Sequence, residues 1–447
     1  MSQDGDPDSE PDSGPGNDPG NEQVLSATAI AEAAYQKAVR KDLPRNYAAN
    51  LAHGLLGQTG FRLVNAPTFL PAFVFILSGS HAAVGFALAA QHFGAAISAI
   101  FGATLIEHRK RVLPVGFAVG MGMRLQVLGL ALSGLLLPPD IAIYAVAVFL
   151  LGLGLFQGMQ GVLFNYLMSK VIPVELRGKL SGLRNFLAGL TASGVAYLGG
   201  KYFVETNFLG NGYGATFLLA FILTTLGLGL LLFIKEPEPP AVRSQVRILE
   251  RLGEIPSLLK SDKAYTRFFL ARGLAALGMM SVPFFAIYAG SIVGLSGSNL
   301  GLFSVAFMLA ATTTNLAWGY IADRYGNRLV FLSALSLWVL ATVLLLMVEA
   351  RAMFFVTFAL LGTGMGGFQI GGQNLVLEFG HREDLPMRIA ISNSAMALMT
   401  GIGTLIAGLI AAFSYTLLFS ISIAVLSASV IIVWLFVDEP RHRVVPR

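Results

Sequence analysis

The chain has 447 residues, of which 55% are hydrophobic and only 12% are charged, and its mean hydropathy is +0.69. A water-soluble domain carries about 25% charged residues, so most of this surface faces a medium other than water. The sequence contains no cysteine, which excludes disulfides, thiolate metal sites and cysteine catalysis.

The first 45 residues differ in composition from the rest of the chain. Eight acids and no Lys or Arg fall within the first 36 residues, and Pro, Gly, Ser and Asn supply most of the remainder as far as residue 21. Such a segment buries too little apolar area to offset the entropy cost of ordering it, so residues 1–22 are predicted to be disordered. Residues 24–42 have the composition of an amphipathic helix and are expected to lie along the membrane surface.

Twelve apolar runs follow this segment. Crossing the hydrocarbon as a helix takes about 20 apolar residues, and such runs fall at 48–77, 81–105, 112–136, 141–168, 180–202, 213–234, 266–292, 298–321, 329–348, 353–377, 388–412 and 415–437. The sequence therefore predicts an all-α membrane protein with twelve transmembrane helices. Its parts are a six-helix half over 46–235, a cytoplasmic linker over 236–265, a second six-helix half over 266–437 and a basic tail over 438–447.

Lys and Arg gather on one side of this topology. If the N-terminus is cytoplasmic, the inner loops, the linker and the tail hold most of them, whereas the outer loops hold only Lys201 and Arg351. An excess of Lys and Arg marks cytoplasmic loops. We therefore expect both termini on the cytoplasmic side of the plasma membrane, which is the inner membrane in a bacterium.

The two halves also resemble each other in sequence. The run LLGLG at 150–154 recurs as LLGTG at 360–364, and a Phe-Gln pair follows closely in both places. Parallel repeats of six helices are a transporter architecture, in which the substrate site lies between the halves near the midplane.

The loop between the predicted eighth and ninth helices has the spacing G-x-x-x-D-R-x-G-x-R, formed by Gly319, Asp323, Arg324, Gly326 and Arg328. This pattern resembles the cytoplasmic-loop signature of the major facilitator superfamily, and residues 172–179 are similar to that family's P-x-E-x-R-G stretch. The resemblance implies two halves that rock about a central cavity, with this loop as a gate. Gly319 is expected to allow close helix packing, and Gly326 to permit a turn with positive φ.

The corresponding loop of the first half matches the signature only in part. Its candidate gating residues are Glu107 and Arg109, but the acid stands one place late and the second glycine is absent. Gating is therefore expected mainly from the loop of the second half.

Polar side chains recur at places where a lipid-facing helix would be apolar. Gln58, Arg62 and Asn65 are spaced i, i+4 and i+7 and so share one face of the first helix, which Pro67 is expected to open locally. The family resemblance implies that helices 1, 4, 7 and 10 line the cavity. The candidate cavity residues are therefore Gln58, Arg62, Asn65, Gln157, Gln160, Gln369, Gln373 and Asn374.

Three further arginines lie within the predicted spans. Arg124, about midway along the third helix, either lines the cavity or pairs with Glu107, and it is kept as a candidate cavity residue. Arg184 and Arg272 fall within about two turns of the cytoplasmic ends, where a long side chain can reach the headgroups, and are interpreted as structural. The first six spans have no carboxylate at their middle, so the cavity is expected to favour an anionic or amphipathic solute.

The leading hypothesis is a transporter that moves a small organic solute by alternating access and acts as a monomer in lipid. The alternative is a membrane assembly or scaffold protein that keeps the fold without transport. An enzyme is not expected, because no catalytic triad, metal cluster, phosphate loop or carboxylate pair stands at the required depth. No cofactor, metal or nucleic-acid partner is expected either.

Overall fold

The computed structural model describes residues 19–106, 109–239, 256, 259–260, 262–379 and 385–439, and all regular secondary structure within these ranges is helical. The N-terminal part contains α1 (Pro19–Lys41), α2 (Leu43–Val64), α3 (Phe69–Ser78), α4 (His81–Thr104), α5 (Leu113–Leu136), α6 (Pro139–Val171), α7 (Val174–Leu198) and α8 (Gly212–Leu230). The C-terminal part contains α11 (Lys263–Gly278), α12 (Val282–Val293), α13 (Gly297–Tyr325), α14 (Asn327–Met347), α15 (Arg351–Glu378), α16 (Leu385–Phe413) and α17 (Tyr415–Phe436).

These helices form two sets of six long segments. Among the described residues, ten segments are long and apolar enough to span a membrane by length and composition. The other two are α4 and α7, with 24 and 25 residues, which pack lengthwise against α6 and α2 of their own half. The predicted all-α fold with two six-helix halves is confirmed.

The first and seventh segments are each broken near their middle. In the first, α2 ends at Val64 and α3 begins at Phe69, with Pro67 in the gap. In the seventh, a short 3-10 turn at Met279–Ser281 joins α11 to α12, and Pro283 follows directly. A proline lacks the N–H that a continuous helix uses and crowds the preceding turn. The expected opening of the helix at Pro67 is thus confirmed, while the break at Pro283 was not foreseen.

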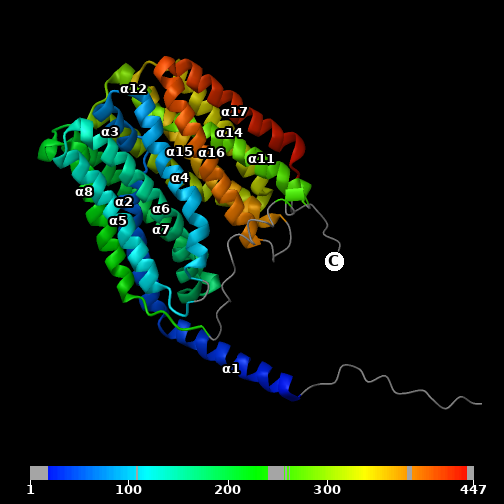
Figure 1. Ribbon diagram of the computed structural model, residues 1–447. Coiled ribbons are helices and arrows are strands. Elements are labelled where there is room, and N and C mark those ends of the chain that lie inside the picture. Colours follow the sequence, from blue (N-terminus) through cyan, green and yellow to red (C-terminus); the bar gives the residue numbers. More distant parts are fainter. Residues whose placement is uncertain are drawn as a thin grey trace, which may run out of the picture.

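The two halves lie side by side and meet along two helix pairs. Figure 1 shows α4 and α16 next to each other at the centre of the molecule, and α7 packs against α13. Glycines allow this approach: a Cβ on Gly85 of α4 would lie 2.7 Å from the Cα of Gly408 on α16, and one on Gly200 would lie 2.7 Å from the Cα of Gly301.

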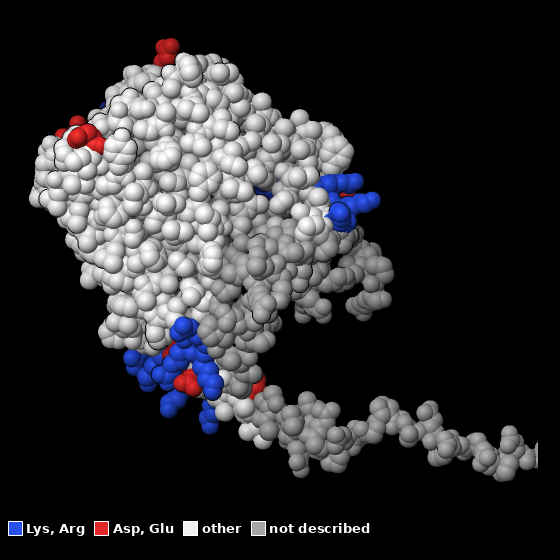
Figure 2. Space-filling model, viewed as in Figure 1, with Lys and Arg blue, Asp and Glu red and all other residues white. Residues whose placement is uncertain are grey.

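Charge is concentrated at the ends of the bundle. Figure 2 shows a broad face almost without charged residues, with Lys and Arg in two groups, one at the right of the view and one at the end from which α1 leaves. We call this the basic end; its exposed cations include Arg40, Lys41, Arg45, Arg109, Lys110, Arg111 and Lys179. The opposite end has the exposed cations Lys201 and Arg351.

Some predicted boundaries differ from the structure. The helix α1 begins at Pro19, so the last four residues of the segment predicted to be disordered are helical, while residues 1–18 lie outside the described part. The fifth membrane segment begins at Val174 rather than near residue 180. Most of the predicted linker and all but two residues of the predicted tail also lie outside the described residues.

Candidate functional site

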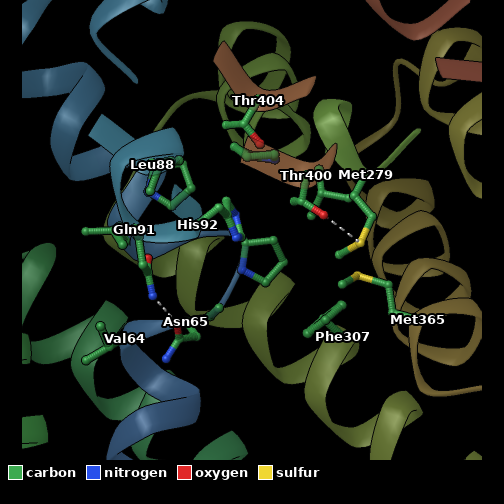
Figure 3. A pocket seen from close by; sticks show the side chains of 16 residues that line it. Val64, Asn65, Leu88, Gln91, His92, Met279, Phe307, Met365, Thr400 and Thr404 are labelled. Carbon is green, nitrogen blue, oxygen red and sulfur yellow. Dashed lines mark hydrogen bonds between the residues drawn. The ribbon is translucent and has the colours of Figure 1, made fainter. Parts of the chain in front are cut away.

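A cavity of about 150 Å³ lies between the halves, at the level of the two broken segments. Both Pro67 and Pro283 line it, as do Asn65 of the first break and Met279 of the second. The rest of the lining comes from α4, α13, α15 and α16. Its residues include Gln91, His92, Phe307, Met365, Thr400 and Thr404. Figure 3 shows these side chains converging on the cavity from both halves. Irregular backbone at membrane depth is tolerated where it lines such a cavity.

Amide side chains form the polar wall of the cavity. The Nε2 of Gln91 donates to Oδ1 of Asn65 at 2.9 Å (Figure 3) and to Oε1 of Gln157 at 3.1 Å. The structure therefore brings together two predicted cavity residues, Asn65 on the first segment and Gln157 on the fourth, through a glutamine of the second. Thr400 and Thr404, one turn apart on α16, were not among the predicted residues, although their i, i+4 spacing was readable in the sequence.

Arg62 lies one turn from the cavity on the basic-end side. Its guanidinium Nη1 donates to the hydroxyl of Thr312 on α13 at 3.3 Å, a contact that joins the two halves. Thr312 is itself held against Gly189, where a Cβ would lie 1.9 Å from the threonine hydroxyl. In the described part of the chain, no ion pair involves Arg62. The cation is therefore held at mid-membrane by a neutral partner.

The structure places Arg124 away from the cavity. Its side chain is buried inside the N-terminal half, where Nε donates to the carbonyl of Thr224 at 2.7 Å and Nη1 to that of Gly120 at 2.7 Å. Its guanidinium also lies 5.4 Å from the centre of the Phe61 ring. Gln160 lies close to the same site, since a Cβ on Gly120 would be 3.4 Å from its Oε1. Backbone carbonyls thus accept two hydrogen bonds from Arg124, and neither Arg124 nor Gln160 lines the cavity.

Arg184 and Arg272 do not reach for the headgroups as predicted. Their side chains are only 4% and 3% exposed. Arg184 lies across Gly54 of α2, with its guanidinium 4.4 Å from the centre of the Phe164 ring. Arg272 donates from Nη1 to Ser392 on α16 at 2.5 Å. The prediction failed for two reasons. The helix α7 begins six residues earlier than expected, so Arg184 lies farther from the helix end. In addition, a glycine on a neighbouring helix leaves room for each arginine side chain, Gly54 for Arg184 and Gly372 for Arg272.

The amides of the tenth segment divide into two groups. Gln369 and Gln373 are exposed on α15, on the face that carries Met365, and Gln373 donates to Gln369 at 3.4 Å. Asn374 instead donates to Asn327 on α14 at 3.2 Å, and Asn327 donates to Glu378 at 2.8 Å. The first two face the basic-end approach to the cavity, whereas Asn374 belongs to the packing of the C-terminal half.

The predicted gating loop is a tight turn of the C-terminal half. Gly326 has φ +94°, as expected, and a Cβ there would collide with the carboxylate of Glu439. Gly319 has open space around it, so its expected role in close helix packing is wrong. Asp323 and Arg324 are exposed, and Arg324 donates to Tyr320 at 2.8 Å. In the first-half loop Arg109 is exposed, and Glu107 lies outside the described residues.

Each half has a carboxylate that closes its basic end, a feature the sequence analysis missed. Glu236, just after the sixth segment, accepts the backbone N–H groups of Val112 and Leu113 at the start of α5 and pairs with Lys170. Glu439, just after the twelfth, accepts the backbone N–H of Arg328 at the start of α14 at 3.1 Å. We call these two groups the clasps. Carboxylates are favoured at helix N-termini, where N–H groups are unpaired. A Glu-Pro pair follows each helix in the sequence and was the available signal.

The halves are joined from the middle of the bundle to the opposite end. In the described residues, four side-chain hydrogen bonds cross between them, namely Arg62 to Thr312, Thr68 to Ser304, His81 to Tyr415 and Glu205 to the backbone of Ser298. The ring of His81 also packs against Phe284 of the other half. These four bonds lie between the middle of the bundle and the end opposite the basic end.

Solved structures share this architecture. The nucleoside transporter NupG matches with a TM-score of 0.65 and 14% identity, covering 86% of this chain and 99% of its own. A D-xylose-proton symporter matches with a TM-score of 0.69 and 16% identity, covering 90% and 99%. The xylose transporter XylE from E. coli, in a partially occluded inward-open conformation, matches with a TM-score of 0.66 and 14% identity, covering 89% and 100%. No curated protein sequence matches the chain significantly.

Two broken helices facing a cavity between parallel six-helix halves are an arrangement typical of secondary transporters. Residues 268–447 match the sequence profile of the Major Facilitator Superfamily, and the chain shares its fold with the solved transporters named above. The C-terminal part of the chain is thus similar in sequence to this superfamily, and the whole chain is similar to these transporters in fold.

Proposed function

We propose that this protein transports a small organic anion by alternating access, with its basic end toward the cytoplasm. The observation that carries the proposal is Arg62, a cation near the middle of the membrane with a neutral hydroxyl as its hydrogen-bond partner. A charged side chain at the centre of a helix costs about 2.5–3.5 kcal/mol on insertion scales. An arginine kept there without an acid is suited to an anion that arrives from outside the protein.

The surroundings of Arg62 support an organic solute. A guanidinium binds a carboxylate or phosphate through two parallel hydrogen bonds, and Gln58 and Asn65 on the same helix face would hold hydroxyl or carbonyl groups. The cavity itself combines these amides with apolar walls from Met279, Phe307 and Met365. At about 150 Å³ it is smaller than the 300–1,000 Å³ typical of ligand pockets, which favours a small solute in this conformation.

The contact between Arg62 and Thr312 also links binding to motion. It is one of four side-chain bonds that join the halves in the described residues. A solute anion that takes over the guanidinium would release Thr312 and loosen the halves at mid-membrane. Transport then follows from the exchange of partners, because a ligand shifts a conformational equilibrium only through its different affinity for the two states.

Two sugar probes that differ in one group test the proposal. Thermal unfolding of the purified protein is measured with D-xylonate, which carries a carboxylate, and with D-xylose, which does not. We expect D-xylonate to raise the melting temperature of the wild type and to lose this effect in Arg62→Gln, while Arg62→Lys keeps part of it. Uptake of the same two probes into proteoliposomes checks transport directly.

Arg124→Gln is the matched control, since it removes a buried arginine that lies away from the cavity. It should lower the melting temperature without solute but keep the preference for D-xylonate. Equal stabilisation by D-xylonate in the wild type and in Arg62→Gln would refute the anion site. Stabilisation and uptake of D-xylose alone would keep the transporter and replace the anion with a neutral solute.

A further inference from the structure

We propose that Arg184 and Arg272 form a second, inner anion station, through which the solute passes between Arg62 and the basic end. The inference rests on the proposed function, because it extends the path that starts at Arg62. Both arginines were expected to be structural and to reach the headgroups, but both are buried at the same depth in opposite halves.

The two arginines have unsatisfied charge. Each is at least 96% buried, and the Nε of each has no hydrogen-bond partner. In the described part of the chain neither takes part in an ion pair. Arg184 has a contact with the Phe164 ring, and Arg272 has one hydrogen bond, to Ser392. Buried charges are normally paired, so two such cations are poised for a mobile anion.

Arg184 crosses the cavity-facing side of α2. A Cβ on Gly54 would lie 2.1 Å from the Nε of Arg184, so the arginine occupies the space that a side chain at residue 54 would need. Gly54 and the cavity residue Asn65 are separated by eleven residues, which is three turns and returns to the same helix face. Gln58 lies on that face between them. Arg184 is thus positioned on the path, three turns from the cavity.

Arg272 lies beside a glycine of the other half. A Cβ on Gly372 of α15 would lie 3.3 Å from the Nε of Arg272 and 3.2 Å from the ring of Phe331. Gly372 follows the cavity residue Met365 by seven residues, or two turns, on the same helix face. The exposed Gln373 is next to it. Each half therefore has an arginine whose side chain lies beside a glycine of a neighbouring helix, on the cavity-facing side and toward the basic end.

Both arginines also lie at equal depth. Arg184 is ten residues from the first residue of α7, and Arg272 is nine residues from that of α11. At 1.5 Å per residue these distances are about 15 Å and about 14 Å from the basic ends of the helices. Arg62 lies eight residues beyond Gly54, or about 12 Å nearer the middle. An anion bound at Arg62 could therefore move toward the basic end and bind next between Arg184 and Arg272.

The absence of cysteine allows a direct test that needs no known substrate. A single cysteine is placed on the path by Gln58→Cys near Arg184, or by Gln373→Cys near Arg272. Its modification rates are measured with an anionic methanethiosulfonate carrying a sulfonate and with a cationic one carrying a trimethylammonium group, both applied from the basic end. We expect the ratio of anionic to cationic rates to exceed that of a free thiol. It should fall about tenfold in Arg184→Gln for the first reporter and in Arg272→Gln for the second, because unit charges interact strongly at this range in a partly buried site.

The control is Arg109→Gln, which removes an exposed cation from the basic end and should leave both ratios unchanged, since salt screens surface charges beyond about 10 Å. Gly54→Ala, which displaces the Arg184 side chain without removing its charge, should lower the first ratio as well and covers the case in which Arg184→Gln fails to fold.

If the ratios do not respond to Arg184 or Arg272 while D-xylonate still requires Arg62, the inner station is wrong and the proposed function stands. If D-xylonate binds without Arg62, the proposed function fails whatever the ratios are, and the station fails with it. Reporters that do not react from the basic end would also overturn the inference.

Discussion

The two halves share an arrangement of helices but differ in what fills their interiors. The C-terminal half is packed with rings: Phe268 lies 5.4 Å from Phe331, Phe331 lies 5.3 Å from Phe368, and Phe368 lies 5.8 Å from Trp338, between ring centres. Each half also buries two arginines, Arg124 and Arg184 in one and Arg272 and Arg388 in the other, and the N-terminal half buries His53 in addition. The halves therefore share buried cations and differ in the rings packed around them.

The ion pairs of the two halves differ in burial. Glu236 is 3% exposed and pairs with Lys170, which is 5% exposed. In the C-terminal half, Asp262 is 21% exposed and pairs with Arg388, which is 3% exposed. The following predictions test this comparison.

The largest effect is expected at the buried clasp. Glu236→Gln leaves the Lys170 ammonium buried without its carboxylate, and breaking a buried pair in this way costs about 3–5 kcal/mol. Asp262→Asn, in the less buried pair of the C-terminal half, should cost about 1 kcal/mol. Unfolding midpoints of the purified variants measure both. The contrast between the halves is lost if the two substitutions destabilise equally. Glu236→Leu combined with Lys170→Met should recover the part of the loss caused by the buried lysine, but not the part caused by the missing cap of α5.

A smaller effect is expected at Arg124. Its two bonds to carbonyls involve a charged donor, for which about 1.5–3 kcal/mol each is typical, and glutamine can replace one of them. Arg124→Gln should therefore destabilise the protein by about 2–3 kcal/mol and leave solute preference unchanged. Arg62→Gln should instead leave the stability without solute nearly unchanged and remove the preference for D-xylonate. Melting curves with and without D-xylonate separate the two, and a change of preference in Arg124→Gln would return this residue to the solute site.

The junction between the halves is tested where α4 and α16 approach each other. A Cβ on Gly85 would lie 2.7 Å from backbone atoms of α16, so Gly85→Ala must push α4 and α16 apart. We expect a shift toward opening at the opposite end of about 1–2 kcal/mol, within the usual range of conformational coupling. Thr404→Cys, at a fully buried cavity position, should then react with an impermeant maleimide from that end. Gly161→Ala is the control, since Gly161 has open space around it, and equal labelling in both would contradict the packing.

The smallest effect concerns pH. Burial alone would raise the pKa of Asp262, but hydrogen bonds from the backbone N–H of Tyr265 and from Arg388 outweigh it and lower this pKa below its usual range. Because the folded pKa is below the unfolded value of about 3.9, the carboxylate adds stability above about pH 4 and loses it as the pH falls through the folded pKa. Asp262→Asn should lower the melting temperature at pH 6 and converge with the wild type in acid. Asp42→Asn, whose partner Lys235 is largely exposed, should have little effect at either pH, as surface pairs do.

The sequence predicted the halves and the spans because hydropathy and the placement of Lys and Arg are local signals. It also indicated Asn65, Gln157 and the turn at Gly326, since a helix face or a positive φ follows from spacing and residue type. It failed for Arg124 and Arg184, whose roles depend on which carbonyl or glycine lies opposite on another helix. It also failed for Gly319, because a glycine at a helix end does not reveal whether a neighbour is close.

The clasps have a consequence for how the protein is made. Glu236 is the group that closes the start of α5, and it directly follows the sixth membrane segment in the chain. A ribosome adds residues in order, at about 5–20 per second, so the first half receives its closing group before any helix of the second half has been synthesised. We expect the first half to mature as a separate insertion unit, with the second closed in turn by Glu439 once α17 has been synthesised. The assembly step that remains is the docking of two finished bundles along α4 with α16 and α7 with α13.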